Sequence, residues 1–239
     1  SKNASGSSTS TLSFFTPHGV VVGGGNNTAT GSYSFIGGGG DAGTAGNRNV
    51  ASGAWASVVG GMKNSASQEA SFVGGGYGNT ASGLGSAVVG GGLYGSIQQG
   101  QFAANLASGQ AAFVGAGFNN IASGYGASVI GGNSNIASSN YAVASGAYGT
   151  TRSIVNSFAY GSVPIAGAYG VSQSALLVLG IETTNATATV LRSDTSAASG
   201  TNQVILPNNS AYFFTGEVVS GVTGGGNTKG WTIEGVIKR

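Results

Sequence analysis

The phrase ASGAWASVVGG at residues 51–61 returns as ASGLGSAVVGG at 81–91 and as ASGYGASVIGG at 122–132. Each copy begins with Ala-Ser-Gly, and this triplet or a close variant starts at residues 29, 51, 66, 81, 107, 122 and 137. The steps between successive starts are 22, 15, 15, 26, 15 and 15, so the base period is 15, with inserts near 39–48 and 93–104. A fixed period this short is typical of a solenoid, and it suits one coil of short β-strands and tight corners.

The composition excludes several classes of protein. Glycine supplies 47 of the 239 residues, and only 6% of the residues are charged. A net charge of +2 with eight basic residues is too small for a surface that binds nucleic acid. The chain has no cysteine, so disulfide and thiol chemistry are excluded, and it has no apolar run long enough for a membrane helix. We therefore expect no nucleic-acid partner, no membrane insertion, no metal and no cofactor.

An apolar pair precedes each glycine-rich corner, as in Val58-Val59 and Phe72-Val73. Neighbouring residues of a strand point to opposite faces, so the pairs predict two apolar columns. The second member is always Val or Ile, which suits a narrow interior, and we expect the core column to be Val22, Ile36, Val59, Val73, Val89, Val114 and Ile130. The first member then lies outside and needs a cover. Another copy of the chain is the simplest cover, and we expect a homotrimer.

The corners themselves are rich in glycine and asparagine. Glycine reaches positive φ without steric cost, and asparagine tolerates the left-handed region. Asparagine recurs there at Asn26-Asn27, Asn64, Asn79, Asn119-Asn120 and Asn135. We expect both residue types to serve the sharp turns between strands.

The motifs SVVGG at 57–61, SFVGG at 71–75 and SVIGG at 128–132 resemble the head repeats of trimeric autotransporter adhesins. The resemblance covers residues 19–162 and implies an all-β, trimeric, left-handed parallel β-solenoid (β-roll). Residues 1–18 would be an N-terminal connector. The coiled-coil stalk and membrane anchor of that family have no counterpart here, so an intact autotransporter is not expected.

After Pro164 the pattern changes to longer strands separated by turn signals. We expect strands over 175–183, 186–193, 202–207, 210–223 and 229–239, which predict a β-sandwich-like domain at residues 166–239. The stretch from residue 201 to 239 is similar to C-terminal segments of bacteriophage tail fibres and tailspikes. Five strands are few for a sandwich. We therefore expect either a piece cut from a longer fibre or a sandwich completed by strands of neighbouring chains.

These resemblances imply a structural and receptor-binding segment of a phage tail fibre, located on the virion tail outside cells. Its partners would be other fibre proteins and a host surface polysaccharide or other receptor. A polysaccharide depolymerase with an active site between chains and a bacterial adhesin head remain as alternatives. No catalytic residue is expected: the acids form no close motif, Asp41 and Glu69 suit solvated inserts, and lone His18 has no triad partner.

Aromatic side chains outside the two apolar columns are the candidate binding residues. Flat rings with a polar edge suit stacking against sugars, and Tyr and Trp dominate binding hot spots. The alternative is that these rings pack between chains or cap the coils. The candidate glycan-binding residues are Tyr33, Trp55, Tyr77, Tyr94 and Tyr125.

Overall fold

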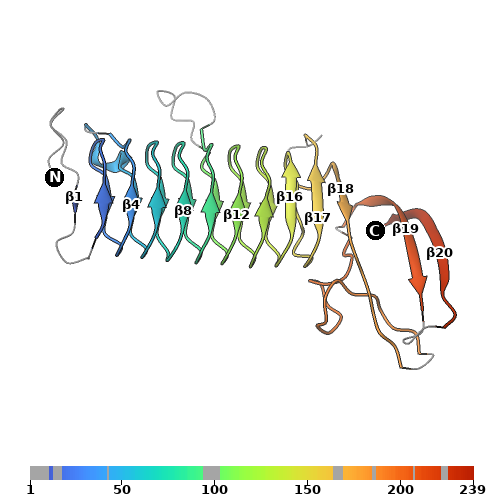
Figure 1. The fold of residues 1–239 in the computed structure, drawn as a ribbon. Coiled ribbons are helices and arrows are strands. Elements are labelled where there is room, and N and C mark those ends of the chain that lie inside the picture. Colours follow the sequence, from blue (N-terminus) through green and yellow to red (C-terminus); the bar gives the residue numbers. More distant parts are fainter. Residues whose placement is uncertain are drawn as a thin grey trace. The chain divides into compact units, whose positions relative to one another are not determined.

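The computed structural model describes residues 11–12, 18–41, 43–93, 103–163, 169–184, 187–206, 208–221 and 226–239. It is an all-β chain that forms a parallel β-solenoid of about nine coils, followed by a two-stranded antiparallel sheet (Figure 1). The expected parallel β-solenoid is therefore confirmed. One short 3-10 helix, η1 (Ala45–Asn47), interrupts the strands of the described residues.

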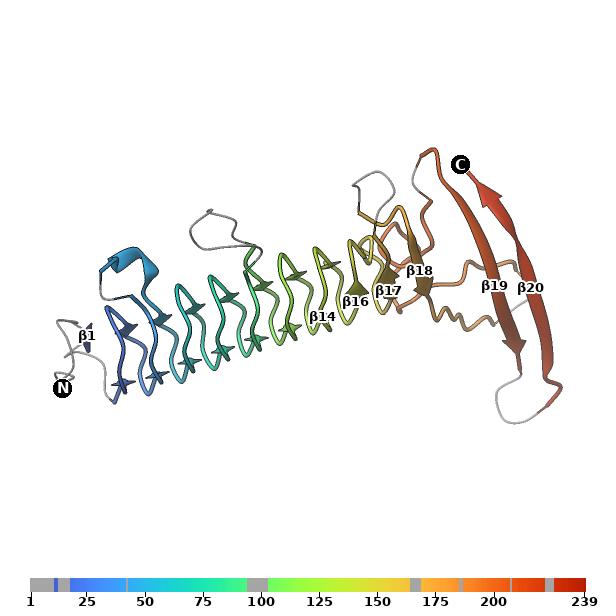
Figure 2. The same cartoon turned by 90° about the horizontal axis from the view of Figure 1, so that it is seen from above.

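Each coil contributes one strand to each of two parallel sheets, which Figure 2 shows in two rows. Sheet A is formed by β1 (Thr11–Leu12), β3 (Thr28–Ala29), β5 (Val50–Ala51), β7 (Ser65–Ala66), β9 (Thr80–Ala81), β11 (Leu106–Ala107), β13 (Ile121–Ala122) and β15 (Ile136–Ala137). Sheet B is formed by β2 (Val20–Val21), β4 (Phe35–Ile36), β6 (Ser57–Val58), β8 (Phe72–Val73), β10 (Ala87–Val88), β12 (Phe113–Val114), β14 (Ser128–Val129), β16 (Val143–Gly146), β17 (Phe158–Gly161) and β18 (Gln173–Leu176).

The interior between the sheets is narrow and apolar. Sheet A contributes an alanine from each of seven successive coils, and every one of these alanines is fully buried. From β4 to β14, sheet B contributes one buried branched residue per coil, and these are Ile36, Val58, Val73, Val88, Val114 and Val129. In β16 and β17 the same position holds Ala144 and Ala159. Because small alanines face branched residues, the two sheets approach closely along the whole coil stack.

The expected core column is correct at Ile36, Val73 and Val114 and wrong at four other coils. There the second residue of the pair lies outside, at 65% exposure for Val22, 50% for Val59, 50% for Val89 and 58% for Ile130. The cause is that pairs such as Val58-Val59 and pairs such as Phe72-Val73 are offset by one residue in the register of sheet B. Ser57 pairs with Phe72, and Val58 with Val73, so the first valine of Val58-Val59 takes the interior position.

The outer face of sheet B alternates between two kinds of coil. Three coils place a phenylalanine before the buried residue and a glycine after it, as in Phe72-Val73-Gly74. The coils between them place a small residue before and a branched one after, as in Ser57-Val58-Val59. We call the resulting surface the outer apolar face; it comprises Val20, Val22, Phe35, Val59, Phe72, Val89, Phe113, Ile130, Val143, Phe158 and Tyr160.

A buried asparagine ladder joins the coils at the glycine-rich corner. Its members Asn27, Asn49, Asn64, Asn79, Asn105, Asn120 and Asn135 are all fully buried. The Asn79 Nδ2 donates to the carbonyls of Gly75 (2.8 Å) and Gly91 (2.9 Å), and its Oδ1 accepts the N–H of Asn105 at 3.1 Å. Only Asn26 and Asn119 of the expected corner asparagines adopt positive φ. The others serve as buried hydrogen-bonding groups, which the expectation of left-handed turns did not cover.

Both inserts leave the coil just before an asparagine of this ladder. Asn49 follows the first insert, and its N–H still bonds the Asn27 Oδ1 at 3.1 Å. Asn105 follows the second insert and bonds Asn79 in the same way. The coils therefore resume in register after each insert. Residues 94–102 of the second insert lie outside the described residues.

The last parallel strand of the solenoid, β17, ends at Gly161, and the segment after it remains part of the same compact unit. The two compact units of the chain are Ser1–Gln203 and Val204–Arg239. β18 reverses direction and pairs antiparallel with β17, so it covers the open edge of sheet B. Further bonds hold the following segment against the last coil: the Val155 N–H donates to Thr201 (2.9 Å), and Asn156 Nδ2 donates to Ser193 (2.7 Å).

The C-terminal unit contains a long hairpin of β19 (Ala211–Ser220) and β20 (Lys229–Lys238). The strands expected near 210–223 and 229–239 are thus confirmed. The described parts of 186–193 and 202–207 hold no strand, and the described residues of this unit form no second sheet, so a sandwich is not formed within one chain. One hairpin face, which we call the hairpin apolar face, comprises Tyr212, Phe214, Val218, Trp231, Ile233 and Ile237.

Replacing Asn79 by alanine should strongly destabilise the solenoid. The substitution removes the side-chain partner of the Gly75 carbonyl and of the Asn105 N–H, while the Gly91 carbonyl keeps the Tyr77 N–H at 3.0 Å. Each of the first two groups costs about 1–3 kcal/mol, so we expect a loss of about 2–6 kcal/mol in urea denaturation followed by circular dichroism. Asn140→Ala is the matched control, because the Asn140 side chain is exposed and accepts the Tyr125 N–H, and it should cost less than about 1.5 kcal/mol. Equal losses would contradict the ladder's role.

The neighbours Val58 and Val59 provide a matched test of the interior. Val58→Asp places an unpaired charge in the fully buried column, which costs several kcal/mol and should abolish the β-sheet circular dichroism signal. Val59→Asp places the same charge one residue away on the outer apolar face, and the coil should still fold. Folding of both variants, or of neither, would refute the assignment.

Candidate functional site

The corner that follows sheet A places one residue per coil in the left-handed backbone region. This position holds His18 (φ 70°), Tyr33 (59°), Trp55 (54°), Ala70 (54°), Gly85 (62°), Ala111 (55°), Gly126 (60°), Tyr141 (55°) and Asn156 (58°). From Trp55 onward, the N–H of this residue donates to the carbonyl before the equivalent position in the preceding coil, as Ala70 N–H does to Ala54 (2.8 Å). We call this line of residues the aromatic edge.

Aromatic residues are costly choices at these positions. A residue with a Cβ pays about 1–2 kcal/mol in the left-handed region, and glycine occupies the same position in two of the coils. Yet four of the nine positions carry an aromatic ring: His18, Tyr33, Trp55 and Tyr141. Strained residues of this kind cluster at binding and catalytic sites, so the edge is the leading candidate for function.

Three of these rings form a continuous parallel stack. The His18 and Tyr33 centroids lie 5.2 Å apart at 3°, and those of Tyr33 and Trp55 lie 5.8 Å apart at 6°. The spacing is close to the separation of neighbouring strands, because each ring comes from the next coil. Tyr33 and Trp55 remain 51% and 55% exposed. The stack fixes the orientation of both rings at the surface.

The structure divides the expected glycan-binding residues. It brings Tyr33 and Trp55 together. It places Tyr125 further along the same edge, where its ring meets Tyr141 edge-on at 5.4 Å. It separates Tyr77 from these rings: Tyr77 is only 7% exposed, at the glycine-rich corner, with the Lys63 Nζ 5.9 Å from its ring centroid. Tyr94 lies outside the described residues.

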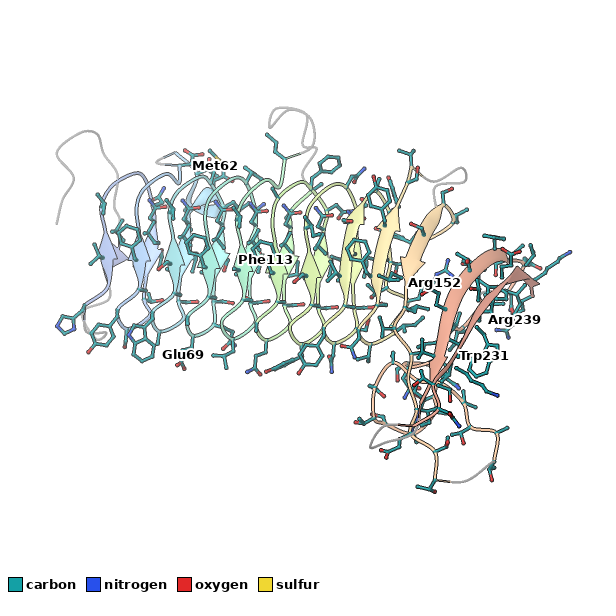
Figure 3. The ribbon with its side chains drawn as sticks, turned by 45° about the vertical axis from the view of Figure 1, so that its right-hand side comes forward. Met62, Glu69, Phe113, Arg152, Trp231 and Arg239 are labelled. Carbon is teal, nitrogen blue, oxygen red and sulfur yellow. The ribbon has the colours of Figure 1, made fainter. Side chains whose placement is uncertain are left out.

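The acidic candidates lie on opposite edges of the solenoid. Glu69 is on the aromatic edge, and Asp41 follows Gly40 in the glycine-rich corner, the corner that also holds Met62 (Figure 3). The Asn47 side-chain amide and the Gly43 N–H, which both donate to Asp41, lower the pKa of its carboxyl. These bonds fix the insert around η1. One chain therefore does not bring Asp41 and Glu69 together as a pair of catalytic acids.

The described residues offer neither a metal-binding cluster nor a membrane-spanning helix. No group of three or more His, Asp or Glu side chains there is arranged to hold a metal ion. No helix among them is long and apolar enough to cross a bilayer.

Sequence reasoning missed two members of the edge, His18 and Tyr141. The distance of each from its neighbour along the sequence indicates that both belong to the edge. His18 lies one base period before Tyr33, and Tyr141 lies one base period after Gly126, so each occupies the position of its neighbour in the adjoining coil. Aligning the copies on this position, rather than on the apolar pairs, would have shown the column.

At the positive-φ positions of the aromatic edge, replacing alanine by glycine should raise the free energy of unfolding. In Ala111→Gly the relief of left-handed strain exceeds the entropy that glycine adds to the unfolded chain, so we expect a gain of about 0.5–1 kcal/mol. Ala116→Gly is the control, because Ala116 is exposed and lacks a positive φ, and it should lose about 0.4–1 kcal/mol. Thermal unfolding measures both, and a loss in both variants would remove the argument from strain.

Comparison with known proteins adds no family to this description. No protein-family model matches the chain, and no curated protein is significantly similar to it.

Proposed function

We propose that this chain is a structural and receptor-binding segment of a trimeric extracellular fibre, of the kind found in bacteriophage tails, which attaches to a glycan on the host cell surface. The solenoid supplies a stiff shaft, and the aromatic edge supplies the contact with the receptor. Three features support the proposal: the outer apolar face, the hairpin apolar face and the strained aromatic residues.

The outer apolar face is the observation that carries the proposal. It spans nine coils from β2 to β17, roughly 38 Å at the spacing of neighbouring strands. Its phenylalanines Phe35, Phe72, Phe113 and Phe158 are 36–38% exposed, and most of its branched residues are more exposed still. A contiguous apolar strip of this length marks a protein interaction surface. A second copy fits it, because that copy has the same coil spacing and matches the strip along its whole length.

The hairpin independently favours association of several chains. An isolated two-stranded hairpin is marginally stable at best in water. Here the hairpin apolar face leaves Trp231 49% exposed and Ile233 46% exposed. The opposite face carries Thr215 and Glu217 at its centre, with the exposed apolar residues Phe213, Val219 and Val236 toward its ends, so the hairpin apolar face is the more continuous of the two. Hairpins from neighbouring chains supply a cover for it and complete a larger β-structure.

The attachment role follows from the aromatic edge and from the resemblance to phage fibre segments. Rings held at a strained backbone position, in a fixed orientation and exposed to solvent, suit a receptor with flat apolar surfaces, such as a sugar. The low content of charged residues fits a receptor bound by stacking and neutral hydrogen bonds rather than by ion pairs.

Light scattering tests the association directly. We expect a native mass of about three times the 23.0 kDa of one chain. Val59→Asp combined with Val89→Asp should lower the mass to that of one chain while β-sheet circular dichroism is retained, because both residues lie on the outer apolar face. Ser123→Asp, on the outer side of sheet A, is the control and should remain trimeric. A monomeric wild-type chain would refute the proposal.

The attachment itself is measured by binding of the labelled wild-type protein to an array of bacterial surface polysaccharides. Retention on one or more polysaccharides, with no release of reducing ends, is the expected result. Release of reducing ends would instead indicate a depolymerase.

A further inference from the structure

One coil departs from the repeat at the aromatic edge, directly beside Trp55. The corner of this coil reads Ser67-Gln68-Glu69-Ala70, whereas the corners before and after it read Ser-Gly-Ala-Trp and Ser-Gly-Leu-Gly. Gln68 and Glu69 are both exposed. Glu69 is also the last charged residue before Arg152, so a carboxylate at this corner is an exception in a nearly uncharged surface.

The ring stack ends at this coil, and only one of its exposed rings keeps an open face there. Tyr33 has His18 against one face and Trp55 against the other, so neither face of Tyr33 can receive a ligand. Among the described residues, Trp55 makes a ring contact with Tyr33 alone, on one of its faces. Its other face points toward the next coil, where Ala70 takes the equivalent position and bears nothing beyond its Cβ.

We propose that this open face of Trp55 binds a neutral hexopyranose unit of a surface glycan, with Gln68 and Glu69 as hydrogen-bonding partners of its hydroxyl groups. The inference rests on the proposed function and names its point of contact. The apolar C–H face of the sugar packs on the indole and takes the place that an aromatic residue at position 70 would occupy. A ring stacked there continues the spacing of 5.2–5.8 Å set by the rings before it.

The carboxylate of Glu69 selects the class of sugar. A carboxylate accepts hydrogen bonds from sugar hydroxyls but repels a second carboxylate, so uronic and sialic acids bind less well than neutral sugars. The backbone supports the arrangement on both sides, since the Ala70 N–H bonds Ala54 (2.8 Å) and the Glu69 carbonyl accepts from Gly85 (2.9 Å). The two coils that form the site therefore cannot move apart without breaking main-chain bonds.

The chain provides its own fluorescent reporter for this site. It has two tryptophans, Trp55 and Trp231, so Trp231→Phe leaves Trp55 as the sole source of tryptophan emission. We would titrate this full-length variant with the methyl glycosides of glucose, galactose, mannose and N-acetylglucosamine. Methyl glucuronide, which differs from methyl glucoside only in its carboxylate, is the matched acidic probe.

We expect at least one neutral glycoside to change the Trp55 emission saturably, and glucuronide to bind at least fivefold more weakly than glucoside. Glu69→Gln should remove that difference. Trp55→Ala should abolish binding in ligand-observed NMR without unfolding, because alanine already occupies the same backbone position at Ala70 and Ala111. Tyr148→Ala is the control, because Tyr148 also has a positive φ (56°) but lies outside the aromatic edge, and this variant should bind as the wild type does.

Silence of all four neutral glycosides, equal binding of glucoside and glucuronide, or binding that survives Trp55→Ala would each overturn the inference. Its failure is distinguishable from failure of the proposed function. A trimer that attaches to surface polysaccharides equally well with and without Trp55 keeps the function and removes this site. A monomer that attaches to none removes the function itself.

Discussion

The hydrogen bond that each coil makes with the next is the constraint on which the rest of this structure depends. Strands of two residues provide few main-chain bonds per coil, so the corners must pair as completely as the strands do. The asparagine ladder achieves this at the glycine-rich corner, where the Asn79 amide, for example, bonds two glycine carbonyls and the N–H of the next asparagine. The fixed period of the sequence follows, because the ladder closes only when each coil returns an asparagine to the same place.

The same constraint determines which positions of the repeat can vary from coil to coil. From β4 to β14 the interior holds alanine on one side and a branched residue on the other, and the ladder holds asparagine. Variation falls on the outer sides of the two sheets, the aromatic edge and the inserts. These are the places where the repeat carries phenylalanine, tryptophan, glutamate and η1. Stability and recognition are thus carried by different positions of one repeat.

The sequence was sufficient to predict the period, the inserts, the parallel β-solenoid and the final hairpin. It was insufficient where two different structural arrangements use the same types of residue. Val58-Val59 and Phe72-Val73 look alike as apolar pairs, and only the register of the strands shows that they are offset by one residue. The role of asparagine was missed for a similar reason: left-handed turns and buried amide ladders use the same residue. The sandwich was predicted from strand-like patterns at 186–193 and 202–207, and the described residues of these segments hold no strand.

The sequence predicted some residues of the candidate site but not their arrangement. Tyr33 and Trp55 could be selected as exposed rings, but parallel stacking depends on backbone conformation that composition does not report. Tyr77 has the same residue type and lies in a similar glycine-rich context, yet it is buried, because it belongs to the other corner.

The alternation on the outer side of sheet B sets a length scale of its own. From β4 to β12 bulky rings recur on every second coil, so the surface repeats at about 9.6 Å although the backbone repeats at about 4.8 Å. The coils between carry the exposed Val59 and Val89 where the phenylalanine coils carry glycine. The side-chain pattern of this face therefore recurs only at every second coil. A partner that matched it at one axial position would match it again only after a displacement of two coils.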